Sequence, residues 1–211
     1  MISKPKTRTR RLLLLPVLQA SYLIGDETTG RAVVVDPRRD VNDYLTDAAE
    51  AGLSIELVIN TRRLVDGERI SLGDVTLEIL ATPGHTPESI SVVVYEHGDD
   101  EIPYGVLTGD TLFIGDVGRP DLLASVGVTA DELAADLYHS VQHKLAELPQ
   151  ATRVFPAHGA GSACGKNLST ETQSTIGEQL QTNYALAPMT KEQFIDVVTE
   201  GQSTAPAYFG F

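Results

Sequence analysis

The stretch from Ala81 to Asp121 reads ATPGHTPESISVVVYEHGDDEIPYGVLTGDTLFIGDVGRPD and contains two turns with candidate metal ligands. His85 lies in a Pro-Gly-His-Thr turn after a β-type run, and Asp110 lies in a Gly-Asp-Thr turn after a second apolar run. Far downstream, His158 follows a third short apolar run in the sequence Phe-Pro-Ala-His-Gly. Histidine and aspartate are typical ligands of divalent transition metals, and loops at strand ends often carry binding and catalytic groups. The pattern therefore predicts a metal site made of His85, Asp110 and His158.

The three motifs PGHT, GDTLF and PAHG resemble the metal motifs of the metallo-β-lactamase superfamily in their order and approximate spacing. The surrounding words GDTLFIGDVGRPDL and GAGSACGK are similar to one branch, the persulfide dioxygenases and their fusions to a sulfurtransferase domain. The resemblance extends from Ser21 to Pro206. It implies an α/β fold of the αββα sandwich type.

One motif of the superfamily is absent from this sequence. The resemblance places a His-x-His-x-Asp-His motif after the strand expected at Ile55–Ile59, but residues 60–67 read NTRRLVDG. The chain then passes almost directly to the hairpin sequence ERISLGDVTLEIL, whereas a helix and a strand normally lie between. We therefore expect a sandwich that lacks a helix and a strand in its first half, and a metal affinity much reduced by the loss of the histidine motif.

The resemblance also implies roles for single residues. It makes His85 and Asp110 ligands of one metal, and His158 a ligand of a second position that single-iron relatives leave free of metal. Arg119 either anchors the structure by pairing with a neighbouring aspartate or binds an anionic thiol substrate through its forked guanidinium. Cys164 is either a buried inert thiol or a reactive substrate-binding thiol, which would require exposure and a lowered pKa.

Composition indicates an ordinary globular protein. Of the 211 residues, 42% are hydrophobic and 21% are charged, which permits a substantial core. The net charge of −13 argues against a nucleic-acid-binding body, because phosphate neutralisation needs clustered lysine and arginine. The single cysteine, Cys164, excludes an internal disulfide framework and suits a reducing compartment, so we expect a cytoplasmic protein.

The N-terminal residues allow two interpretations. Cations in residues 1–11 followed by Leu12–Leu15 resemble the start of a secretory signal, but Pro16 interrupts the apolar run and no convincing cleavage site follows. We therefore predict a basic tail at 1–11, one metallo-β-lactamase-like domain at 12–200 and a linker-like tail at 201–211. No apolar run approaches the roughly 20 residues that span a membrane.

Local patterns predict the main elements. Residues 12–36 alternate like a hairpin, and residues 55–59, 69–80, 89–95 and 104–108 are expected to be strands. Helices are expected from an Asp40 N-cap through Ala51, from a capping box at Thr129, from about Thr170 to Tyr184, and from Lys191 to Glu200. The expected buried face of the helix after Thr129 contains Leu133, Leu137, Val141, Leu145 and Leu148. His139 and His143 fall on its opposite, acidic face, which favours surface histidines over a metal pair.

Three functions are compatible with these features. The first is an Fe(II)-dependent persulfide dioxygenase that oxidises a thiol persulfide, of the glutathione persulfide type, to sulfite. The second is a zinc metallohydrolase of the glyoxalase II type, which cleaves thioesters with Zn(II)-activated hydroxide. The third is a non-catalytic relative with a broken metal site and no cofactor. For the first, the resemblance implies a small-molecule persulfide substrate, a possible sulfurtransferase (rhodanese) partner and a homo-oligomer.

Overall fold

The computed structural model describes residues 8–13, 20–59, 64–122, 127–160, 162–166 and 168–201. Residues 202–211 of the predicted C-terminal tail and residues 60–63, where the histidine motif was expected, fall outside these ranges. Among the described helices, none has the length and apolar character needed to cross a membrane.

The first sheet is built from the N-terminal third of the chain. Its strands lie in the order β1-β2-β3-β4, with antiparallel pairs β1–β2 and β2–β3 and a parallel pair β3–β4. The strands are β1 (Arg8–Leu13), β2 (Ala20–Asp26), β3 (Arg31–Val35) and β4 (Ser54–Ile59), and helix α1 (Asn42–Glu50) connects β3 to β4. The predicted hairpin is therefore present, and β1 begins inside the segment predicted as a basic tail.

The second sheet has the order β12-β11-β8-β7-β6-β5. Its strands are β5 (Arg69–Ser71), β6 (Thr76–Ala81), β7 (Ile90–Tyr95), β8 (Gly105–Gly109), β11 (Arg153–Pro156) and β12 (Ser174–Thr175). A small hairpin of β9 (Leu112–Phe113) and β10 (Asp116–Val117) follows β8. The pairs β6–β7 and β7–β8 are antiparallel and β8–β11 is parallel, so β6, β8 and β11 all run in the same direction.

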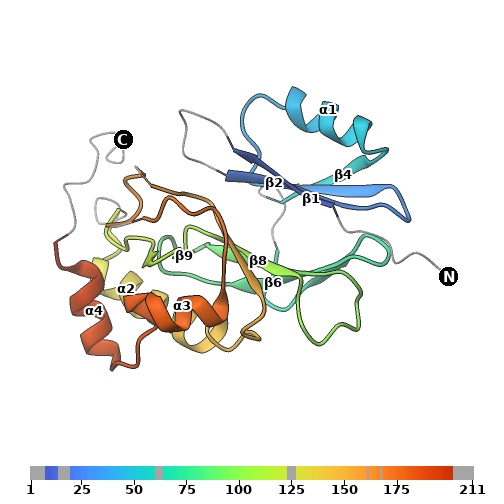
Figure 1. Ribbon diagram of the computed structural model, residues 1–211. Coiled ribbons are helices and arrows are strands. Elements are labelled where there is room, and N and C mark those ends of the chain that lie inside the picture. Colours follow the sequence, from blue (N-terminus) through green and yellow to red (C-terminus); the bar gives the residue numbers. More distant parts are fainter. Residues whose placement is uncertain are drawn as a thin grey trace.

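Helices cover the outer faces of both sheets (Figure 1). Helix α1 lies over the first sheet, whereas the helices of the second half lie beyond the second sheet. These are α2 (Ala130–Ser140), the π-helix η2 (Val141–Leu145), α3 (Ile176–Thr182), the 3-10 turn η3 (Tyr184–Leu186) and α4 (Lys191–Thr199). The arrangement is the αββα sandwich expected from the sequence.

Three apolar clusters hold these layers together. The first joins the two sheets through residues such as Ile24 of β2 and Leu77 of β6, both fully buried. The second joins the second sheet to its helices through Leu137 of α2 and Phe194 of α4. The third packs Tyr44 of α1 on the outer face of the first sheet. The central strands of the second sheet are therefore buried on both faces, which accounts for the nearly continuous burial of β7 and β8.

The helix starting after Thr129 follows its sequence pattern closely. Both bonds of the predicted capping box, between Thr129 and Glu132, are formed. The side chains of the predicted stripe from Leu133 to Leu145 are buried, while Leu148 is only half-buried. The helix changes to π geometry at Val141, where the N–H of Ala146 donates to the carbonyl of Val141 at 2.9 Å. The second predicted capping box, between Thr190 and Gln193, also begins a helix.

Two predicted helix starts were wrong. Asp40 was expected to cap α1, but Val41 holds the N-cap position without a side-chain bond, and the Asp40 carboxylate accepts the N–H of Asn42 at 3.1 Å. The helix expected from about Thr170 starts only at Ile176, because Ser174–Thr175 pair with β11 and the Thr175 hydroxyl caps the first turn. The pairing of β12 with β11 keeps these residues extended, although the local sequence pattern favours a helix.

The connection between the sheets is short. Between β4 and β5, the described residues 64–68 form no helix or strand. The two sheets pack on each other through the inter-sheet cluster, which contains Ile59 at the end of β4 and against which the partly buried Leu64 packs.

Candidate metal centre

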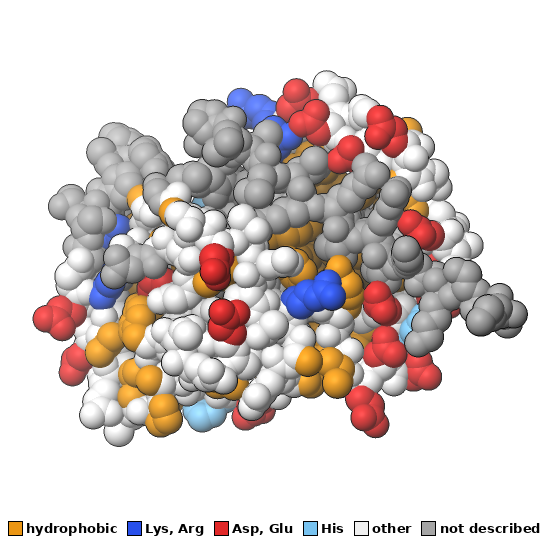
Figure 2. All heavy atoms as spheres, in the orientation of Figure 1, with side chains coloured by type: hydrophobic (Ala, Val, Ile, Leu, Met, Phe, Trp, Pro, Cys, Tyr) orange, Lys and Arg blue, Asp and Glu red, His pale blue; other side chains and the backbone are white. Residues whose placement is uncertain are grey.

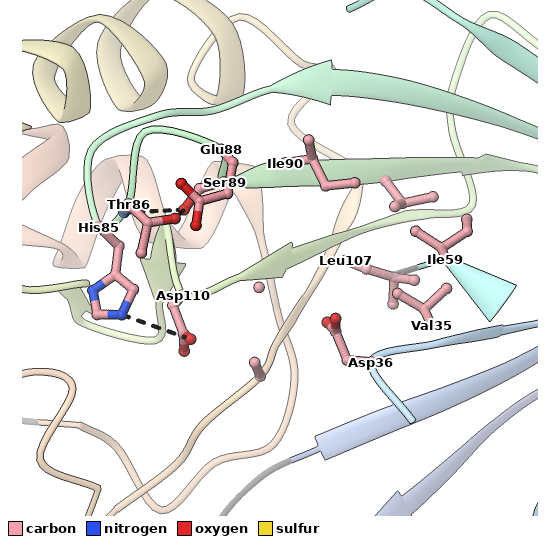
Figure 3. A pocket seen from close by; sticks show the side chains of 13 residues that line it. Val35, Asp36, Ile59, His85, Thr86, Glu88, Ser89, Ile90, Leu107 and Asp110 are labelled. Atoms are coloured by element: carbon pink, nitrogen blue, oxygen red, sulfur yellow. Dashed lines mark hydrogen bonds and ion pairs between the residues drawn. The ribbon is translucent and has the colours of Figure 1, made fainter. Parts of the chain in front are cut away.

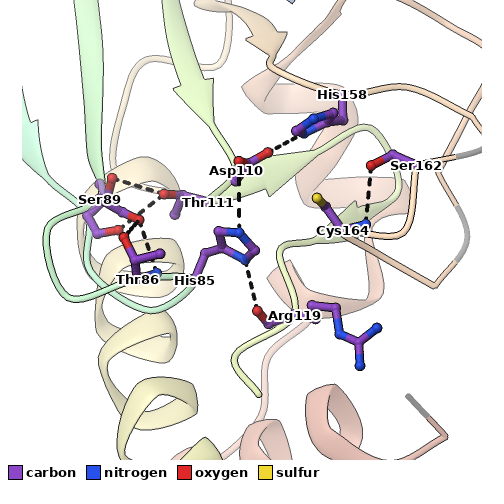
Figure 4. Close-up of polar contacts among 10 residues, drawn as sticks. His85, Thr86, Ser89, Asp110, Thr111, Arg119, His158, Ser162 and Cys164 are labelled. Carbon is purple, nitrogen blue, oxygen red and sulfur yellow. Dashed lines mark hydrogen bonds and ion pairs between the residues drawn. The ribbon is translucent and has the colours of Figure 1, made fainter. Parts of the chain in front are cut away.

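The predicted ligands come together because three strands end at one edge of the second sheet. Since β6, β8 and β11 run in the same direction, the turns that follow them lie at the same end. These turns carry His85, Asp110 and His158, and Figure 4 shows the carboxylate of Asp110 between the two imidazoles. The structure therefore brings the three side chains together.

Packing of helix α2 against the turn and a hydrogen bond fix the position of His85. Gly84 has φ +146°, and a Cβ at this position would lie 2.4 Å from the Cβ of Leu137, so α2 packs directly against the turn. The His85 side chain is 7% exposed, and its Nδ1 lies 2.9 Å from the carbonyl oxygen of Arg119. A carbonyl only accepts hydrogen bonds, so Nδ1 donates, and in the neutral ring Nε2 carries the lone pair. That nitrogen lies 3.9 Å from Asp110 Oδ2.

Asp110 is the central residue of the group. While its Oδ2 faces His85, its Oδ1 forms a short hydrogen bond with Nδ1 of His158. Burial alone would lower the pKa of His158, but hydrogen bonds with Asp110 and Cys164 outweigh it and raise this pKa to about 10. In the metal-free protein, an imidazolium at His158 therefore balances the negative charge of Asp110.

Cys164 lies closer to the predicted ligands than the sequence indicated. Ligand atoms of His85, Asp110 and Cys164 all lie within 4.8 Å of one another. The loop of Cys164 is fixed by two bonds: its carbonyl accepts the N–H of Arg119 at 2.9 Å, and its own N–H donates to the Ser162 hydroxyl at 3.2 Å. The thiol is half-buried.

The side chain of Arg119 forms an ion pair with Asp121. Its Nε and a terminal nitrogen donate to the two carboxylate oxygens of Asp121, each at 2.7 Å, and the side chain is 1% exposed. This bond also lowers the pKa of Asp121. Of the two roles considered from the sequence, the geometry favours the anchor. Through its backbone, Arg119 contacts both His85 and Cys164.

A pocket of about 310 Å³ opens beside this group, between the two sheets. Its floor is apolar, with Val35, Ile59 and Leu107, and His85 and Asp110 lie at one end (Figure 3). The volume lies at the small end of the range for ligand pockets. It therefore suits a small molecule with an apolar portion and a reactive group directed at Asp110.

Asp36 is a pocket residue that the sequence analysis missed. It directly follows β3 with φ +51°, and Figure 3 shows its carboxylate directed into the pocket from the side opposite His85. Burial and the charge of Asp110 raise the pKa of Asp36 to about 6, with His158 offsetting part of the effect. An aspartate directly after the apolar run AVVV follows the same strand-end logic as Asp110, and that signal identifies it.

Replacing Asp36 with asparagine is expected to stabilise the metal-free protein above pH 6. A carboxyl group whose folded pKa exceeds its unfolded value makes stability fall as pH rises, here between about 4 and 6. Asparagine does not ionise, so the variant avoids this loss of stability, which is at most about 3 kcal/mol. Asparagine also tolerates the positive φ of this position. Urea unfolding in the presence of a chelator at pH 4 and pH 7.5 measures the change in the free energy of unfolding. Asp99→Asn, in an exposed turn, is the control. An equal effect at both pH values would contradict the assignment.

The donor atoms of this site are of types that bind transition metals, although none of them belongs to the superfamily's first histidine motif. Nitrogen, carboxylate and thiolate donors are all ligands of such ions. Between Ile59 and His85 the sequence contains no histidine, so the superfamily's first motif has no counterpart there. Among the described residues, His85, Asp110 and Cys164 offer such donor atoms close together.

On the face shown in Figure 2, acidic side chains are scattered and the described lysine and arginine side chains form only small groups. His139 and His143 are exposed on the helical face, as expected, with ring centroids 5.6 Å apart.

Fold and site together place the chain among known proteins. No protein-family model matches it. A crystal structure of a metallo-β-lactamase from Staphylococcus aureus superposes with a TM-score of 0.85 and 31% identity, covering 96% of this chain and 70% of that one. The chain belongs to the metallo-β-lactamase superfamily.

Within the superfamily, the chain is similar to particular proteins. It is 26% identical to the mitochondrial persulfide dioxygenase ETHE1 of Bos taurus over 225 aligned residues, covering 90% of this chain and 80% of that protein. It is also 40% identical over 100 residues to the protein ML0493 of Mycobacterium leprae; that match spans 47% of this chain and 40% of ML0493. The likenesses to ETHE1 and to the metallo-β-lactamase imply a metal cofactor and a related function within the metallo-β-lactamase fold.

Proposed function

We propose that this protein is a metal-dependent persulfide dioxygenase, which oxidises a thiol persulfide to sulfite with Fe(II) as cofactor. The observation that carries the proposal is the group formed by His85, Asp110 and Cys164 at one end of an apolar pocket. The likeness to the persulfide dioxygenase ETHE1 over most of both chains supports the choice of reaction. The overall change is R–SSH + O₂ + H₂O → R–SH + SO₃²⁻ + 2 H⁺, in which the outer sulfur is oxidised and dioxygen is reduced.

The residues of the chain have separate tasks in this proposal. His85 and Asp110 would hold the ion, which would supply the redox chemistry that joins dioxygen to a sulfur anion. The apolar pocket floor excludes water from the persulfide, and His158 holds Asp110 in place through its hydrogen bond. The buried ion pair of Arg119 and Asp121 fixes the loop whose backbone orients His85.

The histidine loop of the superfamily bears on this proposal. The alignment with the bovine protein is longer than this 211-residue chain, so that protein contains residues in the aligned region that are absent here. We infer that the loop with the first histidine motif is among them. We also propose that a sulfurtransferase acts beside this protein, as in the fused relatives that its sequence resembles.

The test compares two reactions on the same preparation. An intact mass of 22.7 kDa first establishes that the assayed chain is this sequence. The protein is reconstituted with Fe(II) without oxygen, then given glutathione persulfide and oxygen, while sulfite and oxygen uptake are measured. Equal amounts of sulfite formed and oxygen consumed, absent from chelator-treated protein, are expected. Thioester cleavage by the Zn(II) form without sulfite formation would instead assign the glyoxalase II type, and no turnover in either assay would assign a non-catalytic relative.

A further inference from the structure

We propose that Cys164 is itself a metal ligand, and that its thiolate takes the third protein position beside His85 and Asp110. This inference rests on the metal dependence of the proposed function, but it does not require the persulfide reaction. It explains how a chain without the first histidine motif retains three donors. The resulting site has one imidazole, one carboxylate and one thiolate.

Distances between the donor atoms carry the proposal. Metal–nitrogen, metal–oxygen and metal–sulfur bonds of about 2.0–2.3 Å place donors on one tetrahedral ion roughly 3.3–3.8 Å apart. The ligand atoms of His85, Asp110 and Cys164 already lie within 4.8 Å of one another without an ion. A contraction of about 1 Å, within the reach of side-chain rotation, therefore brings all three to bonding distance.

The orientation of His85 makes it ready to bind. Because Nδ1 donates to the carbonyl of Arg119, the nitrogen left for a ligand is Nε2, which points at Asp110. At 3.9 Å, Nε2 is too far from Asp110 Oδ2 for a hydrogen bond, although the side chain is more than nine-tenths buried. A buried nitrogen with a lone pair directed at a carboxylate is satisfied by a cation between them.

His158 occupies a different position from the other three side chains. Its Nδ1 is already bonded to Asp110 Oδ1, and among the described residues it is not part of the group of mutually close ligand atoms. A histidine in this place orients the carboxylate toward the ion, as hydrogen-bond partners of metal ligands commonly do. We therefore assign His158 to positioning Asp110 and Cys164 to the metal.

The Cys164 loop is held well enough to present a ligand. Asp116, which is fully buried, accepts the backbone N–H of Lys166 at 2.6 Å and the hydroxyl of Tyr184 at 2.8 Å. At Gly165 a Cβ would lie 2.9 Å from the same carboxylate, so the chain passes directly over it. With the bond from the N–H of Arg119 to the carbonyl of Cys164, the loop is anchored at Cys164 itself and at Lys166.

Cobalt spectroscopy tests the proposal directly. Co²⁺ bound by a thiolate shows a sulfur-to-metal charge-transfer band in the near ultraviolet, and Cys164 is the only cysteine in the sequence. We expect this band on anaerobic titration of the full chain with CoCl₂, reaching its maximum at one equivalent. Cys164→Ser is expected to lose the band and to bind Co²⁺ at least about tenfold more weakly. His143→Ala, which alters the exposed histidine pair, is the matched control and should retain both.

Thiol reactivity provides a second readout. In wild-type protein, one equivalent of Co²⁺ or Zn²⁺ should protect Cys164 from a thiol reagent such as DTNB, and chelator should restore its reactivity. Circular dichroism of metal-free Cys164→Ser should match the wild type, because serine is nearly isosteric and the loop anchors do not use the thiol. Stoichiometric Co²⁺ binding without the band, or with an unprotected thiol, would overturn the proposal.

The two proposals fail in different ways. A charge-transfer band without persulfide oxidation would support Cys164 as a ligand and reject the dioxygenase. Persulfide oxidation by Fe(II)-loaded Cys164→Ser with unchanged metal affinity would retain the dioxygenase and reject Cys164 as a ligand.

Discussion

Asp110→Asn is expected to abolish stoichiometric metal binding while leaving the fold intact. Loss of groups that only support metal ligands commonly weakens affinity by about 10–100-fold, so loss of the central carboxylate should cost at least about 100-fold. The substitution keeps the size of the side chain but removes the charge that faces both His85 and His158. Isothermal titration with Co²⁺ or Zn²⁺ measures the loss, and circular dichroism checks the fold.

A second consequence of Asp110→Asn concerns pH. Without the carboxylate, the pKa of His158 should fall from about 10 toward its ordinary value. A raised histidine pKa contributes stability that is complete below about 6.5 and is lost as pH rises through about 10. The metal-free variant should therefore be less stable than wild type at pH 6, with a smaller difference near pH 10.5.

The control for this prediction is Asp99→Asn. Asp99 lies exposed in the turn after β7, so its replacement makes the same chemical change away from the site. Metal binding by Asp110→Asn at wild-type affinity would show that the ion, if any, is held elsewhere. Metal binding equally weakened in both variants would point to a general charge effect instead.

Gly118→Ala is expected to damage both stability and the site. A Cβ built at Gly118 lies 1.8 Å from the carbonyl oxygen of Asp110 and 3.2 Å from the Cβ of His85. The first of these contacts is with backbone, so the strain cannot be relieved by rotating a side chain. Overpacking usually costs about 1–3 kcal/mol and occasionally more, and we expect about 3 kcal/mol or more here. The displaced Asp110 should also lose its metal.

Gly159→Ala is the matched control for Gly118→Ala. Gly159 directly follows His158, yet the nearest atom to a Cβ there is the carbonyl oxygen of Ser169 at 3.7 Å, an ordinary contact. Its effect on the free energy of unfolding should stay within about 1 kcal/mol. Urea unfolding and metal titration of both variants give the comparison. A Gly118→Ala protein as stable as the control would show that the β9–β10 hairpin moves away from Asp110 without cost.

Local sequence patterns predicted the elements that depend on neighbouring residues. The capping boxes at Thr129 and Thr190 formed because each needs only a bond between residues three positions apart. The apolar stripe of α2 is buried because helical periodicity alone puts its leucines on one face. The same patterns failed at Thr170, where pairing of β12 with β11 decided the start of α3.

The candidate site was partly predictable for the same reason. His85, Asp110 and His158 each end a strand, and the shared direction of β6, β8 and β11 brings their turns to one edge. Strand ends are visible in a sequence as apolar runs followed by turn residues. Together with the family resemblance, the sequence by itself therefore predicted the αββα sandwich and the placement of these three residues at strand ends.

Only the tertiary structure decided what surrounds them. It directed the guanidinium of Arg119 to Asp121, brought Cys164 to within 4.8 Å of His85 and Asp110, and aimed Asp36 into the pocket from the other sheet. Arg119 and Asp121 are near neighbours in the chain, but the approach of Cys164 and the orientation of Asp36 join segments that are far apart in the chain or on different sheets. They depend on how loops are anchored and how the two sheets face each other, which is set by packing of the whole core rather than by any local pattern.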